Sequence, residues 1–226
     1  MRSRATPLVF SVKQLQLCVG AVACVLPPLL WGLGVLVGVG APWPWPIESI
    51  SDYHGTNLRV IFVSALAAIG ILMLCYRGYE RTTEKMWSDN ALANFAGTAA
   101  LIVAAVPNDA DVMSLGNELR YPLATYVHFA AAGSVFVSMF WFSAFRFTMS
   151  DHTRSAHQSP QKRRRNAVYR LCAALIATSM VCLLAGFIFD WWLSIPTGIF
   201  WFESLGMVAF GFAWLTKSQV LPGLGD

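Results

Sequence analysis

The chain has 226 residues, of which 56% are hydrophobic, 13% aromatic and only 12% charged. Soluble domains carry about 25% charged residues, so this composition excludes an ordinary soluble protein and indicates a membrane protein. The net charge of +4 does not indicate a nucleic-acid surface, because the basic residues lie in short loops between long apolar runs. The length suits one membrane domain covering residues 1–226.

The first apolar run covers residues 15–40 and follows three basic residues. It is longer than the apolar core of a signal peptide, about 7–15 residues, and no small-residue cleavage site follows it. We therefore expect a retained membrane span. Pro27 and Pro28 lie near its middle and predict a kink, because neither can donate a backbone hydrogen bond.

The rest of the chain predicts five further spans, at residues 60–76, 90–107, 122–147, 168–193 and 195–215. Of the sixteen Lys and Arg residues, fourteen lie at one set of span ends and only Arg59 and Arg120 lie at the other. The positive-inside rule places the basic side in the cytoplasm. The sequence therefore predicts an all-α bundle of six spans in the inner (cytoplasmic) membrane, with both termini cytoplasmic; it does not define an oligomeric state.

The longest predicted inner loop, residues 148–167, contains the basic run Lys162–Arg165. Such a run either anchors the topology or attracts anionic lipid headgroups, at about 1 kcal/mol per basic residue. The five cysteines lie in or next to apolar segments and form no CxxC pair, so we expect buried free thiols.

A dense polar stretch, Ser51–Arg59, directly precedes the second predicted span. It combines an acid, an imidazole, a phenol, hydroxyls and a guanidinium. We expect it to border any binding or chemical site on the outer side of the membrane, through Ser51, Asp52, Tyr53, His54 and Arg59.

Two polar side chains lie inside predicted spans near this stretch. Glu203 lies eight residues into the sixth span, roughly 12 Å deep, and His128 lies about six residues, roughly 9 Å, into the fourth. A carboxylate at that depth must be paired, protonated or hydrated. We expect both to converge with Asp52, His54 and Arg59, while Asp109 and Asp190 stand on the same outer rim.

Three interpretations of this cluster remain open. It is a structural network that fixes helix packing, an outward-facing cavity for a small molecule or lipid, or a hydrolytic metal site. In the last case His54 and His128 would bind zinc, and Glu203, His128 and Asp52 would be the catalytic side chains. The sequence has no HxxxH or HExxH pair that would place two histidines on one helix face.

Several segments resemble a widespread group of bacterial six-span membrane proteins with no assigned activity. They are Ser49–His54, Arg59–Val63, Tyr76–Tyr79, Lys162–Tyr169, Trp201–Ser204 and Phe210–Lys217. This resemblance implies the six-span architecture and no particular activity.

A more distant similarity is to the CREST membrane hydrolases, which include alkaline ceramidases and adiponectin receptors. Their pattern combines a serine, an aspartate and three histidines around zinc across seven spans, and Ser51, Asp52, His54 and His128 match parts of it. This similarity implies a metal-dependent hydrolase of a lipid amide or ester. Glu203 occupies the last predicted span, where that superfamily carries paired histidines.

Overall fold

The computed structural model describes residues 11–39, 45–78, 88–108, 122–149 and 159–224. All regular secondary structure in these ranges is helical, which confirms the all-α prediction. The long helices are α1 (Val12–Val37), α2 (Arg59–Cys75), α3 (Asp89–Ala105), α5 (Pro122–Trp141), α6 (Pro160–Ile188) and α7 (Gly198–Ser218). Short helical segments are η1 (Ser51–Gly55), the π-helical η2 (Phe142–Arg146) that continues α5, and η3 (Trp191–Leu193).

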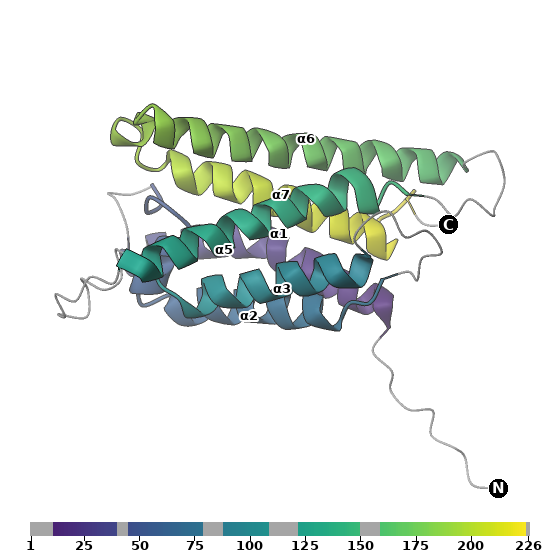
Figure 1. Ribbon diagram of the computed structural model, residues 1–226, viewed down its shortest axis with the longest axis horizontal. Coiled ribbons are helices and arrows are strands. Elements are labelled where there is room, and N and C mark those ends of the chain that lie inside the picture. The colour runs from purple at the N-terminus through teal and green to yellow at the C-terminus, as the bar shows by residue number, and fades with distance from the viewer. Residues whose placement is uncertain (1–10, 40–44, 79–87, 109–121, 150–158, 225–226) are drawn as a thin grey trace, which may run out of the picture.

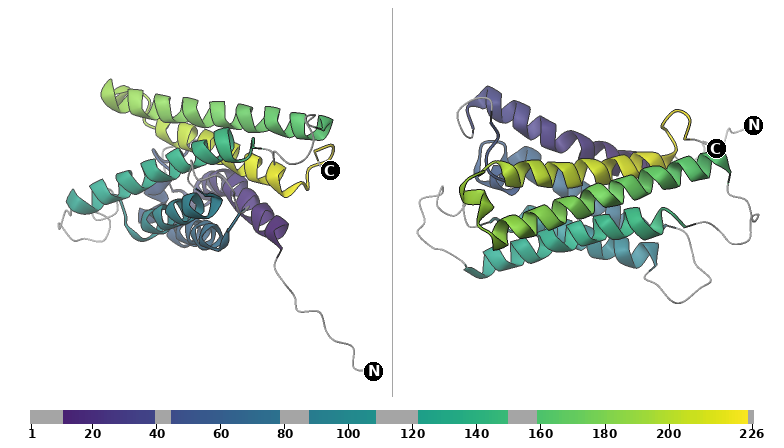
Figure 2. Two further views of the ribbon diagram at one scale, coloured as in Figure 1. Left: turned by 45° about the vertical axis from the view of Figure 1, so that its right-hand side comes forward. Right: turned by 90° about the horizontal axis from the view of Figure 1, so that it is seen from above.

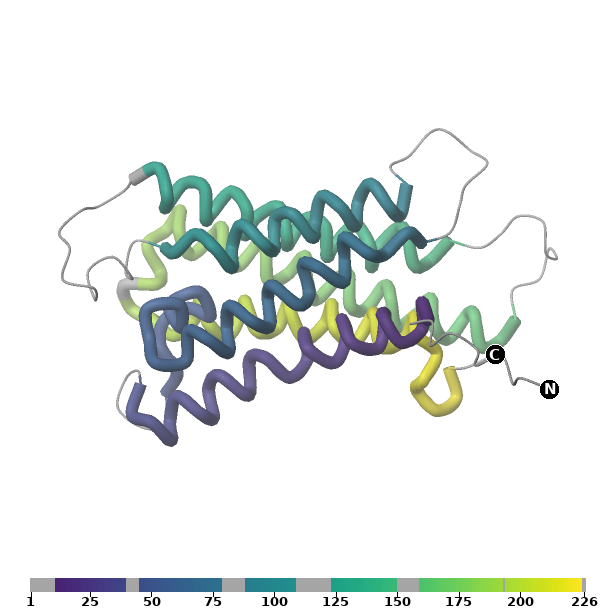
Figure 3. Tube along the Cα trace, turned by 90° about the horizontal axis from the view of Figure 1, so that it is seen from below, coloured from purple at the N-terminus to yellow at the C-terminus, as the bar shows by residue number. Residues whose placement is uncertain are grey.

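The long helices lie side by side along the longest axis of the molecule (Figure 1). Each packs against the next in chain order, and α7 returns to pack along α1, so the contacts close into a ring. Seen from above, α7 lies between α1 and α6 (Figure 2). The segment 45–58, which connects to α2, folds over one end of this ring, hereafter the η1 end (Figure 3). The first residues of α1 and the last residues of α7 lie at the opposite end.

Four described helices are long and apolar enough to cross a membrane: α1, α5 with η2, α6 and α7. The helices α2 and α3 have 17 residues each, about 26 Å at 1.5 Å per residue. They run beside the longer helices for most of the bundle's length (Figure 1). The structure thus has several apolar helices arranged as a multi-pass membrane protein would arrange them.

The start of α6 differs from the sequence prediction. Residues 148–167 are predicted as a loop, whereas α6 begins at Pro160. The Ser159 hydroxyl accepts a hydrogen bond from the Lys162 amide, and proline suits the first helical position. The basic run therefore lies on the first turns of a helix that continues into the apolar segment.

The helix α1 continues through Pro27 and Pro28 without interruption. Its backbone lies very close to that of α7 where Gly20 faces Gly211. A Cβ atom added to Gly20 would lie 2.8 Å from the Gly211 carbonyl oxygen. Small residues at this crossing allow the two helices to pack closely, as is common in membrane bundles.

The core has two apolar clusters, one in each half of the bundle. Away from the η1 end, the rings of Tyr76 and Trp214 lie 5.0 Å apart, and that of Phe147 lies 5.3 Å from Trp214. In the same half of the bundle, at the start of α3 and the end of η2, buried Asp89 pairs with buried Arg146. The second cluster lies under η1.

Candidate functional site

The segment 45–58 is held in place by hydrogen bonds between its own residues and by one buried aromatic side chain, that of Tyr53. The Thr56 hydroxyl donates to the Tyr53 carbonyl (2.9 Å) and accepts from the Leu58 amide (3.1 Å), which leads the chain into α2. The Tyr53 ring is fully buried, 6.2 Å from the ring of Phe200. Burial raises the pKa of the Tyr53 phenol to about 12.

Glu203 ties this segment to α7. One carboxylate oxygen, Oε2, accepts hydrogen bonds from the Ser49 hydroxyl (2.8 Å) and the Ile50 amide (2.7 Å). One turn earlier in α7, the Phe200 amide donates to the Glu48 carbonyl (2.7 Å). The carboxylate that the sequence places inside a span is therefore satisfied by the loop that covers it.

Asp52 lies at the centre of the loop's polar contacts. Its Oδ2 accepts from the Ser49 amide (3.0 Å), and its Oδ1 accepts from the side-chain amide of Asn108 after α3 (2.6 Å). Burial raises the pKa of Asp52, while these two hydrogen bonds and the nearby His128 oppose that rise.

His128 lies on α5 and is fully buried. Its Nδ1 lies 2.7 Å from the Val106 carbonyl oxygen, and its Nε2 lies 3.0 Å from the Ser51 hydroxyl oxygen. A carbonyl oxygen can only accept, so Nδ1 carries the proton. In the neutral ring Nε2 then accepts the Ser51 hydroxyl proton, which creates a serine–histidine pair.

His54 faces a different neighbour. Its Nε2 lies 3.3 Å from the Ala104 carbonyl oxygen, and its ring packs edge-on against Phe62 with 6.1 Å between centroids. The side chain is 1% exposed. Burial, assisted by the positive charge of Arg59, lowers the pKa of His54.

Six predicted site residues thus belong to the segment 45–58 or contact it: Ser51, Asp52, Tyr53, His54, His128 and Glu203. Arg59 is exposed at the first position of α2. Asp109 lies outside the described residues. The described ranges contain no group of three or more His, Cys, Asp or Glu side chains arranged to hold a metal ion.

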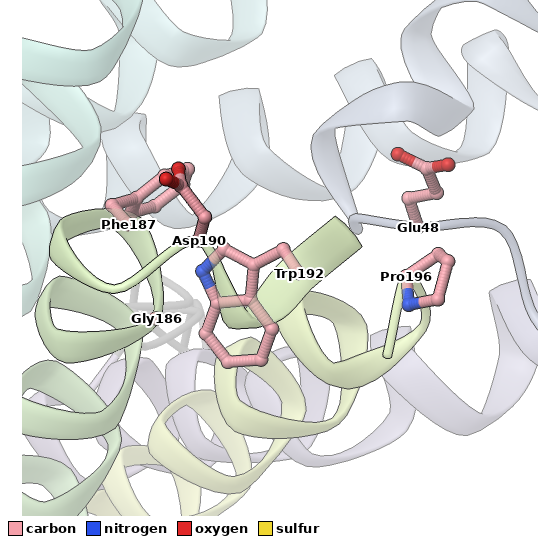
Figure 4. A pocket seen from close by; sticks show the side chains of 6 residues that line it. All are labelled: Glu48, Gly186, Phe187, Asp190, Trp192 and Pro196. Atoms are coloured by element: carbon pink, nitrogen blue, oxygen red, sulfur yellow. The ribbon is translucent and has the colours of Figure 1, made fainter. Parts of the chain in front are cut away.

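Asp190 lies apart from these contacts, on the turn between α6 and α7, where its backbone has a φ of 54°. It borders an open recess of about 340 Å³ at the η1 end, lined by Glu48, Gly186, Phe187, Asp190, Trp192 and Pro196. Figure 4 shows the Trp192 indole between Asp190 and Pro196, with Glu48 on the other side of the recess. A Cβ atom at Gly186 or Gly198 would collide with this indole, so both glycines are needed to seat it.

Four residues of these contacts were not predicted from the sequence as site residues: Ser49, Asn108, Glu48 and Trp192. Ser49 donates hydrogen bonds to Glu203 and Asp52, and Asn108 donates one to Asp52. The sequence signal for these two residues is that each has an acidic neighbour, Glu48 before Ser49 and Asp109 after Asn108. Glu48 and Trp192 meet only through the fold, because 144 positions separate them in the chain.

Comparison of the chain with models of protein families, with characterised proteins and with solved structures finds no match.

Proposed function

We propose that this protein is a six-span protein of the bacterial cytoplasmic membrane that binds the cationic group of a small molecule or lipid in a recess on its outer side. The recess at the η1 end, with two carboxylates and an indole around it, is the observation that carries this proposal.

The charge distribution supports the orientation. Nine basic residues of the described ranges lie on or next to the helix segments toward the end opposite η1 (Figure 3), namely Lys13, Arg77, Arg146, Lys162, Arg163, Arg164, Arg165, Arg170 and Lys217. The positive-inside rule directs that end to the cytoplasm. The short helices α2 and α3 fit as the second and third spans, because 17 residues is the lower limit for crossing the hydrocarbon core. The η1 end then faces outward.

The chemistry of the recess supports a cationic ligand. Glu48 and Asp190 supply negative charge, and the aromatic faces of Trp192 and Phe187 attract ammonium groups by their quadrupoles. About 340 Å³ lies within the usual range of ligand pockets, roughly 300–1,000 Å³. A primary or quaternary ammonium group carries the positive charge that both the carboxylates and the aromatic rings attract.

The surroundings of the recess favour a lipid with an amine headgroup over a free amine as the ligand. Exposed apolar side chains cover the adjoining end of α6 and the start of η3, at Ile188, Phe189 and Trp191. An acyl chain can lie against this surface while the headgroup amine reaches the carboxylates. A soluble amine would use the carboxylates and the indole alone.

Native mass spectrometry of the purified full-length protein tests the proposal. Phosphatidylethanolamine should remain bound more strongly than phosphatidylglycerol with the same acyl chains. The double variant Glu48→Gln, Asp190→Asn should weaken retention of phosphatidylethanolamine by roughly two- to thirtyfold, since each lost contact between an exposed carboxylate and the ammonium group contributes about 0.2–1 kcal/mol. Competition by free choline or ethanolamine would identify a soluble amine as sufficient.

Trp201→Phe is the matched control for Trp192→Phe. Trp201 packs edge-on against Trp31 outside the recess, with ring centroids 5.4 Å apart. The first change should leave retention intact, and the second should reduce it. Equal retention of the two lipids by the native protein and by the double variant would contradict the proposal.

A further inference from the structure

The contact between Ser51 and His128 does not belong to the recess and has a different chemical character. We propose that Ser51 is a nucleophile activated by His128, and that the pair hydrolyses a carboxylic ester at the outer surface of the membrane without a metal ion.

The geometry of the pair carries the proposal. Ser51 Oγ and His128 Nε2 are 3.0 Å apart, within the range for a nucleophile and its general base. The Val106 carbonyl, 2.7 Å from Nδ1, fixes the tautomer in which Nε2 has a free lone pair for the serine proton. A nucleophile, a base and a group that orients the base are therefore all present.

The loop also orients the nucleophile. The Ser51 amide donates to the Ser49 hydroxyl (3.0 Å), and that hydroxyl donates to the partly buried Glu203 (2.8 Å). Asp52 follows Ser51 directly and interacts electrostatically with His128. Its carboxylate would stabilise the imidazolium that forms when His128 takes the serine proton.

The burial of the two side chains is unequal. His128 is fully buried, whereas Ser51 retains 8% of its surface. The base is thus shielded from water, and the substrate approaches from the side of the serine. On the same helix, Leu123, Tyr126 and Phe129 are largely exposed. Because these side chains would face acyl chains in a membrane, we assign the substrate to lipid esters.

The reaction balances with water as the second substrate. Ser51 Oγ forms a bond to the carbonyl carbon while its proton moves to Nε2 of His128. The bond from that carbon to the alcohol oxygen breaks, and the alcohol leaves with the proton from Nε2. Water then gives a proton to His128 and attacks the acyl group, the bond to Ser51 Oγ breaks, and the proton returns to the serine. The products are a carboxylic acid and an alcohol.

Labelling with a long-chain alkyl fluorophosphonate tests the inference in membranes that contain the full-length protein. Mass spectrometry should locate the phosphonyl group on Ser51. Ser51→Ala should abolish labelling, and His128→Gln should slow it by about a hundredfold or more, the usual contribution of a general base. Ser134→Ala is the control, because the Ser134 hydroxyl bonds only within α5, to the Ala130 carbonyl, and this variant should label like the native protein.

The variant Ser51→Cys keeps the inference testable if His128→Gln does not fold. Its new thiol should react with iodoacetamide at pH 6.5 faster than the exposed native Cys75, because the imidazole would remove the thiol proton. An unlabelled Ser51 in folded native protein, labelling that does not depend on His128, or a thiol slower than Cys75 would each overturn the inference. None of these results depends on ligand binding at the recess.

Discussion

The Ser49 hydroxyl donates a 2.8 Å hydrogen bond to Glu203, across 154 positions of sequence. Together with the Ile50 amide on the same carboxylate oxygen, this contact fixes the segment 45–58 to α7. Loss of either donor would leave the partly buried carboxylate with weaker compensation for its burial. The contact therefore predicts that loop and helix lose order together.

Substitution of Glu203 should lower the stability of the protein. Glu203→Ala leaves the Ser49 hydroxyl and the Ile50 amide without their acceptor, which costs about 1–3 kcal/mol for each unsatisfied buried group. Glu203→Gln keeps one acceptor oxygen and should cost less. Thermal unfolding of the purified protein in detergent measures both.

Glu48→Gln is the control for this comparison, because the Glu48 side chain is exposed. It should leave the unfolding temperature close to that of the native protein. An unfolding temperature for Glu203→Ala equal to that of Glu48→Gln would show that the contact between loop and α7 adds no stability.

His54 should make the stability of the protein depend on pH below neutrality. Its pKa in the folded state is lower than the ordinary value of 6.5, so the unfolded chain binds its proton first as the pH falls. The stabilising contribution of neutral His54 is complete above pH 6.5 and decreases as the pH falls toward the folded pKa.

Unfolding temperatures measured between pH 7.5 and pH 5 test this expectation. His54→Gln, which can still donate to the Ala104 carbonyl, should show a weaker decrease over this interval than the native protein. The difference between the two curves isolates His54 from Asp52 and His128. Parallel curves would contradict the assignment.

The buried pair of Asp89 and Arg146 at the opposite end should behave differently from the η1 contacts. Asp89→Ala leaves a buried guanidinium without its partner, which should cost about 3–5 kcal/mol. Adding Arg146→Met to Asp89→Ala removes the unpaired charge and should restore much of this loss. Chemical unfolding of the single and double variants gives the two values. No recovery in the double variant would show that the loss does not come from the unpaired charge.

Zinc should not be a stoichiometric component of the folded protein. In the neutral His128 ring, Nδ1 donates to Val106 and Nε2 accepts from Ser51, so a metal ion at Nε2 would have to displace the serine. Protein purified without chelator should hold well below one zinc ion per chain. One zinc ion per chain, lost in His128→Ala, would instead support the metal-dependent hydrolase.

The helices could be predicted from sequence because apolar runs and basic loops are local signals. The start of α6 was misplaced because the charges of the basic run masked the capping signal at Ser159 and Pro160, although that signal is also local. The proximity of Glu203 to the segment 45–58 was expected from its depth in the sixth span.

The partners of these side chains could not be predicted. They include the Ile50 amide and the carbonyls of Ala104 and Val106, which every sequence carries and only the rotation of the helices selects. The pairing of Ser51 with His128 likewise depends on how α5 lies against the loop. Residue types indicated a polar cluster, but not which atoms meet.

Both proposals require the η1 end to face outward, and reporter fusions measure this directly. Alkaline phosphatase, which is active only outside the cytoplasm, should be active when fused after residue 115 and inactive when fused after Gln219. Green fluorescent protein, which fluoresces in the cytoplasm, should give the reverse pattern at the same two positions. Reporters on the same side at both positions, or phosphatase activity after Gln219, would contradict the six-span topology and the outward-facing site.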